Sequence, residues 1–126
     1  MRTIQHHIDP FGSHELVLTC DERDPDAGGA SHEYEVHRSG GKQIGGKQIA
    51  QISFQHGPRG ADGYLSGCNH AVILAVLIDR YEALQAGPFA CDSNDRCLYA
   101  LRTVLDIERS RAAERKARGV LGVNKD

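Results

Sequence analysis

The chain of 126 residues contains no apolar run long enough to cross a membrane. Its first residues, MRTIQHHIDPF, lack the continuous apolar core of a signal peptide. The formal net charge of -2 gives no overall preference for nucleic acid or for a membrane surface. We therefore expect a cytosolic protein with no DNA or membrane partner. The composition, 40% hydrophobic and 25% charged, is ordinary for a globular chain of one small domain.

Metal-binding and catalytic motifs are also absent from the sequence. The four cysteines form no CxxC pair and the seven histidines form no HxxxH or HxH pair, so we expect reduced thiols, no metal site and no other cofactor. There is no GxSxG, P-loop, GxGxxG or HExxH motif, and the loop GPRG at 57–60 lacks the Lys-Ser/Thr of a phosphate loop. The sequence therefore gives no indication of an enzyme.

The first half of the chain is typical of β-strands. Residues 15–20, 32–38 and 49–54 are rich in β-forming side chains, and a turn-forming stretch follows the first of them. The segment GGKQI occurs at 40–44 and again at 45–49, which indicates an insertion in a hairpin loop, where added length costs little. We expect a strand-rich half over residues 1–60.

The second half predicts two helices. Asn69 caps a helix that runs to residue 86, where Gly87-Pro88 stops it. Residues 71–78 are apolar almost all round, which predicts packing against other helices or a partner chain. A second helix starts at Asp92 or Ser93 and ends as a basic, polar segment. The predicted fold is α+β in one domain: a small antiparallel sheet followed by an antiparallel helix pair over residues 69–119.

Two arginines in the basic segment have a spacing that suits an anion. Arg111 and Arg115 are four residues apart, so they lie on one face of a helix one turn from each other. Two guanidinium groups placed in this way suit a diphosphate. The alternative is a solvated basic end that complements the helix dipole.

The connector between the helices, LQAGPFACDSNDR at 84–96, has more polar and aromatic character than a tight turn needs. Asp92, Ser93 and Asp95 are good cap or first-turn residues, and Phe89 could plug the end of the core. Asn94 fits neither role well. Its amide offers a donor and an acceptor, which suits a base edge or a ribose hydroxyl.

Five motifs follow one another in the chain: FQHGPR at 54–59, GYLSGC at 63–68, VLIDRYE at 76–82, QAGPFAC at 85–91 and RGVLG at 118–122. In this order they resemble the phage Thoeris anti-defense protein 1 family, whose helical half is similar to the phage anti-CBASS protein 2. The resemblance runs from about residue 13 to residue 122. Its strand half is the weaker part.

The resemblance implies a sponge in the cytoplasm of an infected bacterial host. Members of the family bind glycocyclic ADP-ribose signals of TIR-domain immunity and hold them intact. Some members also bind cyclic di- or trinucleotides in a second type of site. The absence of catalytic motifs fits this function, because tight binding needs no transition-state stabilisation.

Candidate ligand residues follow from the positions that match. Asn94, Arg111 and Arg115 match family ligand residues, and Arg59 is a further candidate phosphate contact. Leu84 stands where the family has an aromatic Phe that contacts the base, which makes Phe89 the nearest aromatic candidate.

For the second site the candidates are Asn69 and Arg109, and Asn69 stands where the anti-CBASS relatives have Thr. The helix that is apolar nearly all round predicts self-assembly as a dimer or a higher cyclic assembly, and the resemblance implies a hexamer with sites at subunit junctions. The alternatives are an enzyme that cleaves the signal and a protein-interaction module that uses the basic helix.

Overall fold

The computed structural model describes residues 2–7, 16–26, 28–38, 48–55 and 67–119. The chain divides into two compact units, Met1–Gly67 and Cys68–Asp126. This division lies between residues 60 and 69, where the sequence predicted the change from strands to helices. That both units fold together as one domain stays a prediction.

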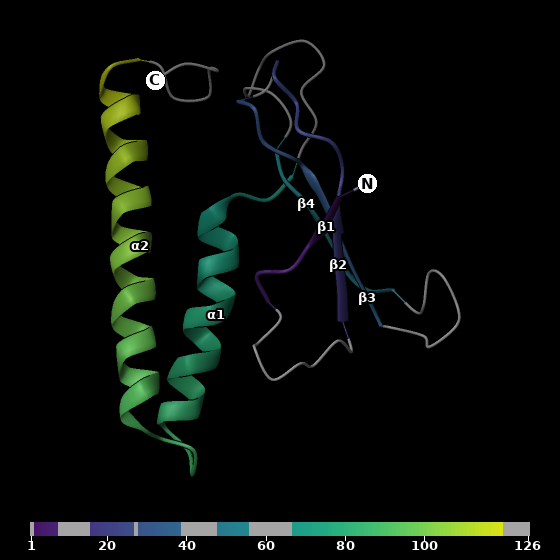
Figure 1. The fold of residues 1–126 in the computed structure, drawn as a ribbon. Coiled ribbons are helices and arrows are strands. Elements are labelled where there is room, and N and C mark those ends of the chain that lie inside the picture. Colours follow the sequence, from purple (N-terminus) through teal and green to yellow (C-terminus); the bar gives the residue numbers. More distant parts are fainter. Residues whose placement is uncertain (1, 8–15, 27, 39–47, 56–66, 120–126) are drawn as a thin grey trace. The chain divides into compact units, whose positions relative to one another are not determined.

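The first unit contains a four-stranded sheet in the order β1-β2-β3-β4, in which every neighbouring pair is antiparallel (Figure 1). The strands are β1 (Arg2–Ile4), β2 (Leu16–Cys20), β3 (Glu33–Arg38) and β4 (Gln48–Ser53). The last three match the predicted strands to within one residue at either end, and the α+β class is confirmed. The sequence did not predict β1, a three-residue strand that pairs with β2.

The sheet has one apolar and one polar face, because side chains alternate along each strand. The register places Tyr34 opposite Cys20 on β2 and Ile52 on β4. The ring of Tyr34 meets the ring of Phe54 edge to face at 5.6 Å between centroids. On the other face, the Ser53 hydroxyl donates a hydrogen bond of 2.6 Å to the Glu33 carboxylate. Cys20 is the most buried apolar side chain of the sheet.

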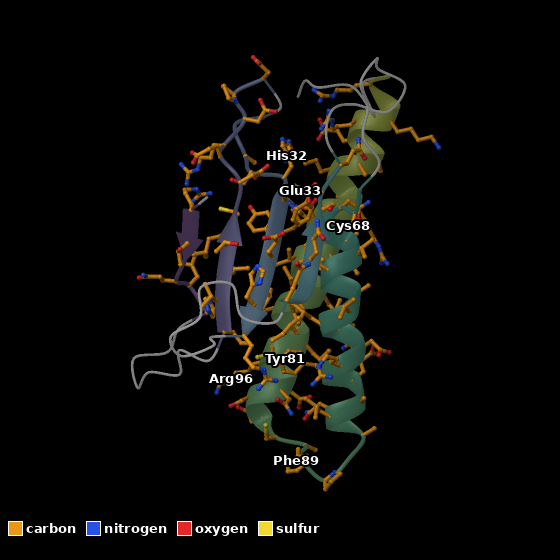
Figure 2. All side chains as sticks on the ribbon, turned by 90° about the vertical axis from the view of Figure 1, so that its right-hand side faces the viewer. His32, Glu33, Cys68, Tyr81, Phe89 and Arg96 are labelled. Carbon is orange, nitrogen blue, oxygen red and sulfur yellow. The ribbon has the colours of Figure 1, made fainter. Side chains whose placement is uncertain are left out.

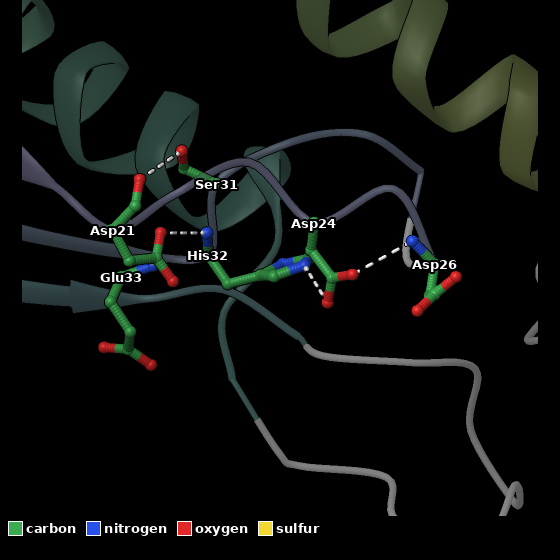
Figure 3. Close-up of polar contacts among 6 residues, drawn as sticks. All are labelled: Asp21, Asp24, Asp26, Ser31, His32 and Glu33. Atoms are coloured by element: carbon green, nitrogen blue, oxygen red, sulfur yellow. Dashed lines mark hydrogen bonds and ion pairs between the residues drawn. The ribbon is translucent and has the colours of Figure 1, made fainter. Parts of the chain in front are cut away.

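A polar network holds the turn between β2 and β3 (Figure 3). One Asp21 carboxylate oxygen accepts from the backbone N–H groups of His32 and Glu33, at 2.9 and 3.3 Å. The Ser31 hydroxyl donates to the Asp21 carbonyl at 2.8 Å, and the His32 ring lies 3.7 Å from the Asp24 carboxylate. Ser31 and His32 are both buried, so the bonds of the Ser31 hydroxyl and of the His32 backbone N–H satisfy polar groups that water does not reach.

The second unit is a pair of antiparallel helices, α1 (His70–Gln85) and α2 (Asp92–Ala117) (Figure 1). The Asn69 side chain accepts from the Val72 N–H at 3.1 Å and so caps α1, as predicted. Gly119, at φ +72°, ends α2 through a bond from its N–H to the Lys116 carbonyl. Among the described residues, no helix is both long and apolar enough to cross a membrane.

The contact between the helices leaves apolar side chains on their outer faces. Leu98 is the one buried residue of the two helices. Val72 and Val76 on α1 are 49% and 55% exposed, and Val104 and Ile107 on α2 are 44% and 62% exposed. The apolar surface that the sequence predicted around α1 is thus present, and much of it lacks cover within the helical pair.

Candidate functional site

The connector between α1 and α2 is held by two side-chain amides. The Gln85 side chain bonds to both backbone polar groups of Cys91 and to the Asp95 carboxylate. The Asn94 amide nitrogen donates to the Phe89 carbonyl at 3.1 Å. These bonds give an exposed six-residue loop a defined shape, since its backbone has partners other than water.

The N-cap of α2 differs from the sequence prediction. Asp92 and Asp95 lie in the first turn, as expected, but the N-cap residue is Cys91, which makes no side-chain capping bond. The Gln85 amide bonds to Cys91 instead, from the end of the other helix. The sequence analysis did not identify Gln85 as a functional residue. The one indication of its role in the sequence is an amide side chain shortly before the helix stop at Gly87-Pro88.

Phe89 does not plug the end of the helical core, which was one of the two predicted roles. Its side chain is 74% exposed, at the tip of the connector (Figure 2). Leu84 lies half-buried in the last turn of α1, five residues before it. The connector therefore presents an aromatic ring, an aliphatic side chain and the half-buried Asn94 amide within a short segment. Such a set can cover the face and edge of a nucleobase.

Arg111 and Arg115 lie near the other end of the helical pair. They occupy successive turns of one face of α2, where Arg111 is exposed and Arg115 is half-buried. The nearby Glu114 carboxylate pairs with Arg118 at 3.4 Å. Ile107, 62% exposed, lies one turn before Arg111 on the same side. A diphosphate with an apolar group attached would match this surface.

The structure does not bring the connector and the two arginines together within one chain. Asn94 and Arg111 are seventeen residues apart on the same straight helix, which corresponds to about 25 Å along its axis. A cyclised ADP-ribose is folded back on itself and cannot span this length. The two groups of candidate residues are therefore either two separate sites or halves of a site that two chains complete.

The candidates for a second site, Asn69 and Arg109, lie at one end of the helical pair. Their chain neighbours His70 and Glu108 make a contact of 3.3 Å between the ring nitrogen and the carboxylate. Asn69 caps α1, so its side-chain oxygen already has a partner in the Val72 N–H. Arg59, the remaining candidate, and the first GGKQI segment lie outside the described residues.

Tyr81 of α1 lies beside Cys97 of α2. The hydrogen bond with Cys97 of α2 raises the pKa of the Tyr81 hydroxyl above its ordinary value of 10.0, and the charge that the Cys97 thiol can carry adds to this. Tyr81 thus connects α1 to α2 through Cys97. In Figure 2 it lies toward the connector end of the helices.

The described residues contain no group of three or more His, Cys, Asp or Glu side chains that could hold a metal ion. A scan against protein-family models gives no match, and a search of curated proteins gives none either.

Proposed function

We propose that the protein is a phage sponge for cyclic ADP-ribose-type immune signals, above all glycocyclic ADP-ribose. It binds the signal in the cytoplasm of the infected bacterial host and releases it chemically unchanged. The support is the ordered set of motifs over residues 54–122, together with two surfaces whose chemistry matches the two parts of such a molecule.

The observation that carries the proposal is the placement of Arg111 and Arg115. They occupy successive turns of one face of α2, and the exposed Ile107 lies one turn before Arg111 on that face, so charged and apolar residues are adjacent along the helix. Arginine binds phosphate oxygens with two parallel N–H groups, which makes a stacked pair well suited to a diphosphate. The opposite end of the helices offers Phe89, Leu84 and Asn94 to the adenosine part.

The separation of these two surfaces leads us to a site between subunits. In a two-fold dimer whose helical pairs lie antiparallel, the connector of one subunit comes beside Arg111 and Arg115 of its partner. The symmetry then produces two equivalent sites. The exposed apolar residues Val72, Val76, Val104 and Ile107 would supply buried surface for this association.

A second type of site for cyclic di- or trinucleotides belongs to the same proposal. Asn69 and Arg109 are its candidates, because both lie at the end of the helical pair where His70 meets Glu108. An exposed arginine can bind a phosphate there while the amide nitrogen of Asn69 donates to a base or sugar oxygen.

The proposal has two rivals of other classes. An enzyme that cleaves the signal would return products in place of the bound ligand. A protein-interaction module would use the basic end of α2 to bind an acidic partner and would ignore small nucleotides.

A thermal-shift screen separates these functions. We expect glycocyclic ADP-ribose to raise the unfolding temperature, because a ligand that binds only the folded state stabilises it by mass action. Arg111→Glu should abolish the shift, and Arg80→Glu, at an exposed position of α1 outside the candidate sites, should retain it. No shift with any cyclic nucleotide, combined with capture of an acidic protein that Arg111→Glu loses, would favour the interaction module.

A further inference from the structure

Gln85 uses all the strong hydrogen-bonding groups of its side-chain amide at the junction of the two helices. Its Nε2 donates to the Cys91 carbonyl at 3.0 Å and to Asp95 Oδ1 at 2.8 Å. Its Oε1 accepts from the Cys91 N–H at 2.9 Å. One side chain at the end of α1 thus bonds to both the N-cap and the first turn of α2.

These bonds close the connector into a ring. Cys91 is six residues from Gln85, and the segment between them contains Gly87, Pro88 and Phe89. The Asn94 amide closes a second, smaller ring through its bond to the Phe89 carbonyl. Phe89 itself is 74% exposed, so its ring gains little orientation from core packing. The two amides, together with the backbone bond from the Ala90 N–H to the Gly87 carbonyl, hold the backbone that carries it.

We propose that Gln85 is a positioning residue for the ligand, which it need not touch. By fixing the connector it presents Phe89 and Asn94 to the adenosine part in one orientation. A loop that is ordered before binding loses less conformational entropy when the ligand arrives, so affinity rises without a new contact. This inference rests on the proposed function and assigns a role within the same site.

The role requires an amide and no other group. A carboxylate has the same size and accepts from the Cys91 N–H, but it cannot donate to the Cys91 carbonyl. It would also lie beside the Asp95 carboxylate, where two like charges repel. Gln85→Glu therefore removes both donated bonds while it preserves the shape of the side chain.

The substitution also predicts that the affinity of the variant for the ligand rises as the pH falls. Two carboxyl groups at one site raise the pKa of one of them, so the introduced carboxyl takes up a proton above the ordinary glutamate value of about 4.3. The protonated form has an O–H donor and again accepts from Cys91, which restores part of the ring. Binding by Gln85→Glu should then recover as the pH falls from about 7 to about 5, relative to the parent protein at each pH.

Gln51→Glu provides a matched control. The Gln51 amide on β4 also donates to a carboxylate, that of Glu33, at 3.4 Å. Gln51→Glu makes the same chemical change at a position far from the connector along the chain. This variant should bind the ligand as the parent does at pH about 7 and at pH about 5.

Two measurements test the proposal on the full chain. Calorimetry with glycocyclic ADP-ribose should show that Gln85→Glu binds about tenfold or more weakly than the parent near neutral pH and regains affinity in acid. Amide hydrogen exchange without ligand should show faster exchange at the Cys91 N–H in the same variant, with protection of the helix centres retained.

Equal affinity of parent and Gln85→Glu, or an affinity loss that does not recover in acid, would overturn the positioning role and leave the proposed function standing. If the parent protein binds no cyclic nucleotide, the proposed function fails. The Cys91 exchange rate then decides by itself whether Gln85 fixes the connector, and an unchanged rate would overturn that as well.

Discussion

In the proposed site, individual residues would contribute to ligand binding in different ways. Arg111 and Arg115 supply charge, Phe89 and Leu84 supply apolar contact, and Asn94 contributes both a bond to the Phe89 carbonyl and an amide for the ligand. Removal of a charge-assisted contact weakens binding most, because such bonds are about twice as strong as neutral ones. Changes at these positions should leave folding largely intact, since none of the five is a buried residue.

Arg115→Ala tests the charge contribution. We expect it to weaken binding of glycocyclic ADP-ribose by about tenfold or more, the equivalent of about 1.5–3 kcal/mol for a charge-assisted contact. Calorimetry measures the affinity, and circular dichroism checks the helix content. Lys116→Ala, on the adjacent exposed position, is the control. Binding equal to that of the parent would mean that the diphosphate lies elsewhere.

Leu84→Phe tests the apolar contact. It restores the aromatic residue of the resembling family at a half-buried position in the last turn of α1. Affinity should stay the same or improve, because stacking on a base contributes about 1–3 kcal/mol. Calorimetry beside the parent protein measures the effect. Loss of binding in a folded variant would show that the adenosine part does not lie against this turn.

At the scale of residues, sequence patterns predicted the cap of α1 and the spacing of the two arginines, but neither the N-cap of α2 nor the contacts across the connector. The Asn69 cap and the common face of Arg111 and Arg115 follow from local geometry alone. The exposure of Phe89 and the bonds of Gln85 depend on how two helix ends meet. The residue pattern within one helix does not indicate how its end meets the end of another helix.

At the scale of elements, the strands and helices differ in what defines them. Hydrophobic periodicity and strong stop signals predicted both helices to within a few residues, because helix hydrogen bonds are local. β1 was missed because a strand of three residues has almost no pattern of its own and exists through its pairing with β2. The face that α1 turns to α2 could not be chosen from a helix that is apolar nearly all round.

The start of α1 gives a stability prediction for an element. Asn69→Ala removes the bond to the Val72 N–H and should lower the free energy of unfolding by about 1 kcal/mol. Asn69→Asp keeps a side-chain oxygen acceptor and should be close to the parent. Urea denaturation followed by helix content measures both variants. Equal loss for the two would indicate that the cap bond contributes nothing to the stability of α1.

At the scale of the whole molecule, the question is what covers the apolar faces of the helices. Val76 and Ile107 are 55% and 62% exposed in the chain as described. We expect a second copy to cover them, because the proposed site needs the connector of one chain and the arginines of another. One symmetric association of two copies would both cover the apolar faces and complete the proposed site.

Assembly can be measured directly. Light scattering at micromolar concentration should give the mass of a dimer or a hexamer, and Ile107→Glu should shift it toward the monomer, because a charge would have to be buried in the interface. Ala113→Glu, an exposed position of the same helix about 120° around its axis from Ile107, serves as the control and should leave the mass unchanged. A parent protein that is monomeric under these conditions would contradict a site between subunits.

The central claim is that the signal is held and returned intact. The most direct measurement incubates the protein with glycocyclic ADP-ribose, removes the protein with any bound ligand by filtration, denatures it by heat and analyses what is released. We expect depletion of the signal from the filtrate and full recovery of the unchanged molecule after denaturation. Recovery of a cleaved product, or no depletion before denaturation, would contradict it.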